Sequence, residues 1–159
     1  MKTIKRILIA TDFSEGSNEA FDEGVRLARQ LEATVLLAHV VEPIGGLVDF
    51  SHIEPLGYWE LKLGQALDRM AHPAREGGLL VETHLLKGDP AVEIIKASED
   101  LRCDLIVMGT HGRTGVPRLL MGSVTERVLR ASPVPIVAVR QRPAAEKEKT
   151  FAKEETEAA

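Results

Sequence analysis

The chain has 159 residues, of which 44% are hydrophobic and 28% charged, and these values are typical of one ordinary globular domain. Its 20 Lys and Arg residues against 24 Asp and Glu leave a net charge of -4, which excludes a general electrostatic attraction to nucleic acid or to a membrane surface. A single cysteine, Cys103, excludes an internal disulfide and a cysteine-based zinc cluster.

No stretch approaches the ~20 consecutive apolar residues that a membrane span requires. The N-terminus runs directly into an apolar strand pattern, without the longer apolar segment and cleavage site of a signal peptide. We therefore expect a cytoplasmic protein.

The first half of the chain alternates strand and helix patterns. Residues 7–10 are apolar on both faces, as in a central parallel strand covered by helices, and helical periodicity from Ser17 predicts the next element. Residues 35–41 predict a second strand. The loop at 42–57 is long for a compact domain, and such loops are often lids or partner contacts. A helix is predicted from Tyr58 toward Glu76, with Pro73 expected to kink or end it.

The second half continues the alternation. Residues 80–86 and 104–108 predict strands, and between them Asp89 is placed as the N-cap of a helix whose first position is Pro90. Residues 123–126 have the S-x-x-E form of a capping box, which predicts a helix from Ser123 to about Ser132. Residues 136–139 predict a last strand, and the prolines before it suit a sheet edge.

Five strands alternating with four helices, without tight hairpin signals, predict an α/β fold with one parallel sheet covered on both faces. We expect this domain to span residues 1–142. Residues 143–159 are mostly Ala, Glu and Lys, which predicts a charged, flexible C-terminal tail.

The segment Gly109-Thr110-His111-Gly112-Arg113 lies between a predicted strand and a predicted helix, and Gly122-Ser123 follows nine residues after Gly112. Glycine permits close backbone approach, and the first N–H groups of a helix attract anions, so the segment predicts a phosphate cradle completed by the N–H groups of Val124 and Thr125. The alternative is that these glycines only form turns and that Ser123 only caps the helix.

Charge supports the cradle. Residues 111–130 carry four arginines against one glutamate, a basic patch inside an acidic protein. The P-loop pattern G-x-x-x-x-G-K-[ST] is missing, and so is a G-x-G-x-x-G after the first strand, which excludes a P-loop motor and a Rossmann dehydrogenase. The histidines show no metal-ligand spacing.

The glycine pattern resembles that of the universal stress protein family, whose nucleotide-binding members carry Gly, two residues, Gly, nine residues, then Gly and Ser or Thr. The resemblance extends to residues 11–14 (TDFS), 38–41 (AHVV) and 133–139 (PVPIVAV), and covers roughly residues 3–140. It implies a doubly wound, adenine nucleotide alpha-hydrolase-like fold with strand order 3-2-1-4-5.

The resemblance also implies a site. In family members that bind ATP, the residue matching Asp12 lies near the ribose, the backbone at Val40 meets adenine, Met108 lines the pocket and Arg113 lies near phosphate. Asp12 has the alternative role of a turn or helix-capping residue. The candidate nucleotide-binding residues are Thr11, Asp12, Val40, Met108, Gly109, His111, Gly112, Arg113, Gly122, Ser123, Val124 and Thr125.

We expect ATP with Mg²⁺ as the ligand, the metal being brought by the nucleotide and not held by a protein cluster. The function so predicted is a nucleotide-dependent stress-response switch or partner-binding module without a catalytic residue, since His111 has no carboxylate partner fixed by sequence. Alternatives are a slow ATPase in the same pocket and a dimeric scaffold that binds no nucleotide. The apolar strand at Pro135–Val139 is expected to form a homodimer at the sheet edge.

Overall fold

A computed structural model describes residues 3–43, 56–111 and 121–141 of the chain. Strands and helices alternate throughout these ranges. The strands are β1 (Arg6–Ala10), β2 (Thr34–Val41), β3 (Val81–Lys87), β4 (Leu105–Gly109) and β5 (Ile136–Val139), and the helices are α1 (Glu15–Leu31), α2 (Leu56–Glu76), α3 (Pro90–Asp100) and α4 (Ser123–Ala131).

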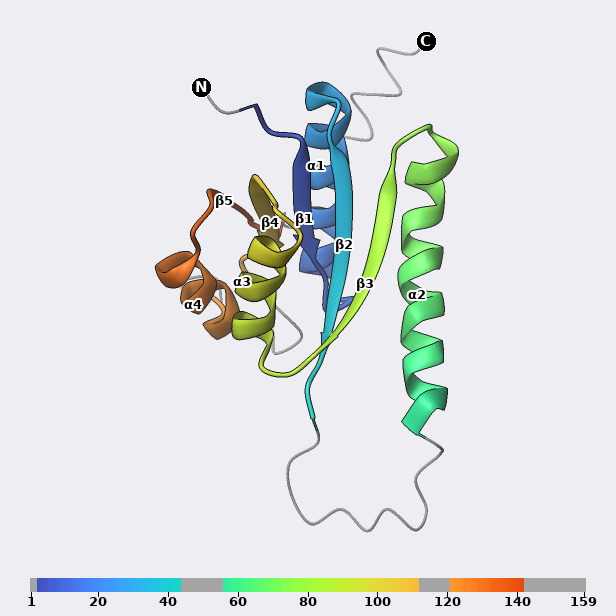
Figure 1. Ribbon diagram of the computed structural model, residues 1–159, viewed down its shortest axis with the longest axis vertical. Coiled ribbons are helices and arrows are strands. Elements are labelled where there is room, and N and C mark those ends of the chain that lie inside the picture. The colour runs from blue at the N-terminus through green and yellow to red at the C-terminus, as the bar shows by residue number, and fades with distance from the viewer. Residues whose placement is uncertain (1–2, 44–55, 112–120, 142–159) are drawn as a thin grey trace.

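The five strands form one parallel sheet in the order β3-β2-β1-β4-β5, which confirms the expected topology. Helices α1 and α2 contribute to the core on one face, and α3 and α4 to the core on the other. Figure 1 shows this layering, with α1 behind β1 and α3 in front of β4. β1 and β4 are neighbours although β2 and β3 intervene in the chain, so the winding reverses between them.

The continuous apolar runs of the central strands follow from this layering. Alternate residues of β1 point to opposite faces, so Ile7 and Ile9 enter the core beneath α1 and α2, whereas Leu8 enters the core beneath α3 and α4. All three side chains are fully buried. A strand that is covered by helices on both faces has no side exposed to solvent, so successive positions are apolar.

Two helix starts differ from the sequence prediction. α1 begins at Glu15 and not at Ser17, because Ser14 is its N-cap and accepts a hydrogen bond from the Ser17 N–H (3.3 Å). α2 begins at Leu56 and not at Tyr58, and it reaches Glu76 as predicted, so Pro73 does not end the helix. Pro73 removes one N–H donor from the helix, and burial of Ala71 and Ala74 in the core stabilises this part of α2 against that loss.

The start of α3 agrees with the prediction, since Asp89 accepts the N–H of Val92 (3.1 Å) and Pro90 is the first helical residue. Cys103 is buried, as expected of a small core residue. The predicted tail and most of the predicted long loop lie outside the described residues. Within the described ranges, no helix is both long enough and apolar enough to cross a membrane.

Candidate functional site

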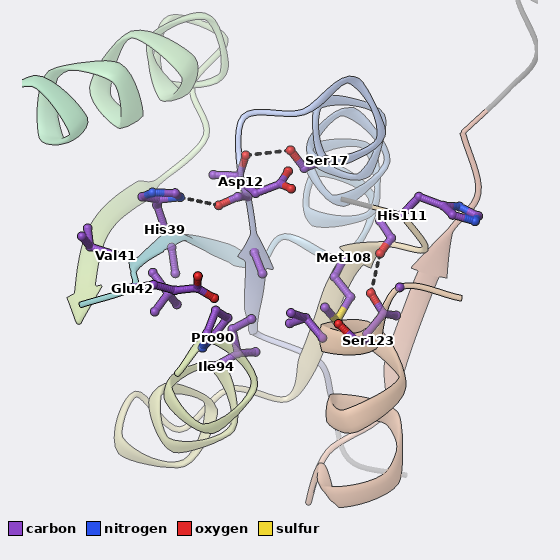
Figure 2. Close-up of a pocket in the computed structure, with 18 of the residues that line it drawn as sticks. Asp12, Ser17, His39, Val41, Glu42, Pro90, Ile94, Met108, His111 and Ser123 are labelled. Atoms are coloured by element: carbon purple, nitrogen blue, oxygen red, sulfur yellow. Dashed lines mark hydrogen bonds between the residues drawn. The ribbon is translucent and has the colours of Figure 1, made fainter. Parts of the chain in front are cut away.

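A cleft of about 570 Å³ opens at the carboxyl ends of β1, β2 and β4, where the direction of winding reverses. Figure 2 shows its walls, which come from the β1–α1 turn, the end of β2, the start of α3, and the N-terminus of α4. Such a crevice is where open parallel sheets place their ligands.

The floor of the cleft is apolar and hollow because two small residues meet there. Ala10 and Ala38 are direct cross-strand partners, and both point to the face covered by α3 and α4. Met108, Val40 and Ile94 surround them. Larger residues at the two alanines would fill this space, so their size creates a slot for a flat apolar group.

The backbone of Val40 faces the same slot. β1 ends at Ala10, and the N–H of Thr11 makes the next bond to β2, to the carbonyl of Ala38 (2.9 Å). Backbone groups alternate in direction along a strand, so the N–H and C=O of Val40 point to the same side as those of Ala38, beyond the end of β1. They present one donor and one acceptor to the cleft.

The β1–α1 turn forms the next wall. The Oδ1 atom of Asp12 accepts the N–H of Ser14 (3.0 Å), and the Oγ1 atom of Thr11 accepts the N–H of Phe13 (3.0 Å) and pairs with the hydroxyl of Ser17 (3.0 Å). Asp12 therefore organises the turn and is not the helix cap, which is Ser14. Both Thr11 and Asp12 line the cleft.

The N-terminus of α4 closes the opposite wall, and here the predicted capping box is wrong. Gly122, not Ser123, is the N-cap, so no side chain caps the helix. Glu126 accepts hydrogen bonds from Arg130 instead (2.8 and 3.2 Å). The first N–H groups of α4 have no partner within the helix, which makes this end a site for an anion. Both Ser123 and Val124 line the cleft there.

Between these walls, β4 ends in tight backbone contacts. A Cβ atom at Gly109 would lie 2.9 Å from the carbonyl oxygen of Gly16 in α1, and a Cβ at Gly16 would lie 2.9 Å from the carbonyl oxygen of His111. The Gly109 carbonyl accepts the hydroxyl of Thr125 (2.7 Å). Gly109 is therefore required by the approach of α1, a reason that its place in the glycine pattern does not reveal.

His111 contributes mainly backbone to the cleft. Its ring points away from the middle of the cleft in Figure 2, and its Nδ1 atom pairs with the hydroxyl of Thr110 (2.9 Å). The Thr110 carbonyl accepts the N–H of Gly122 (2.7 Å), which holds the end of β4 against the start of α4.

Two arginines of the basic patch at residues 111–130 are paired with carboxylates. Arg127 binds Asp89 at the start of α3 (2.8 Å), and Arg130 binds Glu126 (2.8 Å). The Arg127 guanidinium holds the pKa of the Asp89 carboxyl below its ordinary value. The charged side chains among the described lining residues are two carboxylates, Asp12 and Glu42. The remaining arginines of the patch, at positions 113 and 118, lie outside the described residues.

All the sequence-predicted site residues that the structure describes lie around this one cleft, whereas Gly112 and Arg113 fall outside the described ranges. Sequence reasoning missed several lining residues. Alternation along the strands could have identified Ala10 and Ala38. The lining residues on helices could be identified only once the packing of the helices was known. The missed residues are Ala10, Ser17, Ala38, His39, Val41, Glu42, Leu63, Pro90 and Ile94. Among the described residues, no group of His, Cys, Asp and Glu could hold a metal ion.

Residues 3–140 match the model of the Universal stress protein family. A universal stress protein of Methanocaldococcus jannaschii is 38% identical over 144 residues, which cover 86% of this chain and 82% of the relative. The solved structure of the hypothetical protein MJ0577 superposes with a TM-score of 0.74 at 28% identity, covering 90% of this chain and all of the other. The universal stress protein from Archaeoglobus fulgidus, solved in complex with dAMP, has the same fold (TM-score 0.62, 21% identity, 87% and 99% covered).

Proposed function

Because the chain belongs to the universal stress protein family, we propose that it binds an adenine nucleotide, ATP as its Mg²⁺ complex, in the cleft between β1, β2 and β4. The observation that carries this proposal is one continuous cavity joining a hollow apolar slot to a helix start without a side-chain cap. A nucleotide has the same two parts, a flat base and an anionic phosphate chain.

The base is assigned to the slot over Ala10 and Ala38. Adenine presents a hydrogen-bond donor and an acceptor side by side on one edge, and the Val40 backbone offers the complementary pair. The two faces of the adenine ring would pack on the apolar side chains of Met108 and Ile94. The relative that is solved with dAMP carries the same base.

The phosphates are assigned to the N-terminus of α4, where the first N–H groups and the Ser123 hydroxyl supply donors. The family pattern assigns Gly122 to phosphate binding as well, together with Gly112 and Arg113, which lie outside the described residues. Mg²⁺ would offset the repulsion between the phosphates and the carboxylates Asp12 and Glu42, with Asp12 beside the ribose or the metal.

Binding would act as a switch, because the nucleotide would contact both the N-terminus of α4 and the β1–α1 turn across the cleft. The cleft is walled by α4 on one side and by the β1–α1 turn on the other, so occupancy biases how α4 sits against the sheet. A partner that contacts α4 would sense that state. We place this activity in the cytoplasm.

We also propose a homodimer formed through β5. In the described sheet β5 is an outer strand paired with β4 alone, and its apolar residues Ile136, Val137 and Val139 are each partly exposed. An apolar edge strand presents unpaired backbone groups that a second copy could pair by two-fold symmetry.

Isothermal titration calorimetry with ATP and Mg²⁺ tests the nucleotide proposal, with GTP as the comparison ligand. We expect micromolar binding of ATP, weaker binding of GTP, and a melting temperature that rises with ATP concentration. Gly122→Val, which places a side chain in the phosphate path, is expected to abolish binding in a folded protein. No heat and no thermal shift at millimolar ATP would contradict the proposal, and rapid multiple turnover would make the protein an ATPase.

A further inference from the structure

We propose that His39 and Phe13 are positioning residues that hold the β1–α1 turn in the conformation that presents Thr11 and Asp12 to the cleft. The inference rests on the proposed nucleotide function and identifies what prepares one wall of that site. Neither residue was assigned a role by the glycine pattern.

The side chain of His39 connects the β1–α1 turn to β2. Its side chain is 7% exposed, and its Nδ1 atom lies 2.8 Å from the carbonyl oxygen of Thr11. A carbonyl can only accept, so Nδ1 carries the proton. The N–H of Thr11 donates to the carbonyl of Ala38 (2.9 Å), which lies next to His39 in β2. Both polar groups of the Thr11 backbone are therefore fixed by β2, one through the main chain and one through the imidazole.

Phe13 holds an unfavourable backbone conformation. Its φ angle is 62°, in the left-handed region that large side chains rarely adopt. Its ring packs on the His39 ring, with centroids 4.7 Å apart and planes at 44°, and also contacts the core beneath α1 and α2. These contacts offset the backbone cost, so the conformation persists only while the ring has its partners.

The conformation at Phe13 decides what the turn presents. The positive φ brings the Ser14 N–H back to the Asp12 carboxylate, beside the hydrogen bond that the Phe13 N–H donates to the Thr11 hydroxyl. Ser14 then caps α1. A turn that left this conformation would release Asp12 and the start of α1 together. The apparent affinity for a ligand would then be the intrinsic affinity multiplied by the fraction of molecules still in the competent state.

The competing explanation is that His39 and Phe13 are only core residues. Under that explanation, truncating them lowers stability and leaves affinity unchanged in the molecules that remain folded. Positioning predicts in addition that affinity depends on whether residue 13 can adopt a positive φ and whether residue 39 can donate to Thr11.

The experiment compares Phe13→Ala with Phe13→Gly and His39→Ala with His39→Asn. Glycine adopts positive φ at no steric cost, and the asparagine amide can donate from near the position of Nδ1. We expect Phe13→Ala and His39→Ala to weaken binding of ATP with Mg²⁺ by about tenfold or more. Phe13→Gly and His39→Asn are each expected to retain more affinity than the matching alanine variant. Phe21→Ala in α1 is the control, since it removes a buried ring (7% exposed) that lies elsewhere in the same core.

Affinity is measured by calorimetry at a temperature where circular dichroism shows every variant folded. The nuclear Overhauser effect between the amide and α protons of residue 13, strong at positive φ, reports the turn in the protein without ligand. We expect it to be strong in the wild type and weakened in His39→Ala and Phe13→Ala.

Wild-type affinity and an unchanged Overhauser signal in both alanine variants would overturn the inference, as would an equal loss of affinity in Phe21→Ala. If the wild-type protein binds no ATP, the proposed function is wrong and the inference is judged on the turn alone. In that case an unchanged signal in His39→Ala contradicts it, and a weakened signal supports it.

Discussion

Replacing Gly109 by alanine tests whether the end of β4 is fixed by its contact with α1. The added Cβ would lie 2.9 Å from the carbonyl oxygen and 3.0 Å from the carbonyl carbon of Gly16, and 3.4 Å from the His111 carbonyl oxygen. Carbon atoms pack best at about 3.5–4.0 Å, so the contact with the carbonyl carbon is too short by about 0.5 Å or more. The contact with the carbonyl oxygen is shorter still. All three neighbours are backbone atoms, which cannot rotate away as a side chain would.

Relief of the clash requires the start of α1 and the end of β4 to separate by several tenths of an ångström. Overpacking of this kind costs about 1–3 kcal/mol. In a domain of this size, we expect a fall in melting temperature of roughly 3–10 °C. Gly109 also lines the cleft, so displacement of the end of β4 should weaken nucleotide binding. Each 1.4 kcal/mol lost from the binding free energy lowers the affinity about tenfold.

Thermal unfolding by circular dichroism and calorimetry with ATP and Mg²⁺ measure the two effects. Gly64→Ala is the matched control, because a Cβ at this position in α2 meets no atom within 4 Å. It should stabilise the helix by about 0.5–1 kcal/mol and leave binding unchanged. A Gly109→Ala protein with the melting temperature and affinity of the wild type would refute the contact argument.

Three further outcomes are expected. Val137→Lys on β5 should dissociate the proposed dimer in light scattering without loss of the circular dichroism signal, whereas a monomeric wild-type protein at tens of micromolar would contradict the dimer. Arg127 lowers the pKa of Asp89, so this carboxylate stabilises the fold at neutral pH and the contribution is lost as the pH falls below about 4. Asp89→Asn, which keeps a capping side chain, should therefore lower the melting temperature at pH 7 but not at pH 2. Burial raises the pKa of Cys103 to about 11, so thiol reagents at pH 8 should react slowly with the native protein and rapidly after unfolding, and equal rates would place Cys103 outside the core.

The glycine pattern predicted the location of the site but not all the reasons for its residues. Gly109 and Gly122 lie at the cleft as expected, but Gly109 is required by the approach of Gly16 and Gly122 is the helix cap. These reasons involve backbone atoms of α1 and the bond from Gly122 to Thr110, so no local pattern contains them.

Features that depend on near neighbours in the chain could be predicted from local sequence patterns. The apolar runs marked the strands, because both faces of a parallel sheet are buried, and Asp89 with Pro90 marked the start of α3 by bonds within one turn. The strand order was expected only from the family resemblance, since periodicity describes each strand alone.

Contacts between groups that are distant in the chain form only in the packed fold. The hollow floor depends on the register that pairs Ala10 with Ala38, and the paired state of Arg127 depends on the packing of α4 beside α3. The hydrogen bond from His39 to Thr11 spans 28 positions in the chain. A local sequence pattern indicates which face of a strand or helix is buried. Contacts between elements form only when those buried faces pack together, and the cleft is built from such contacts.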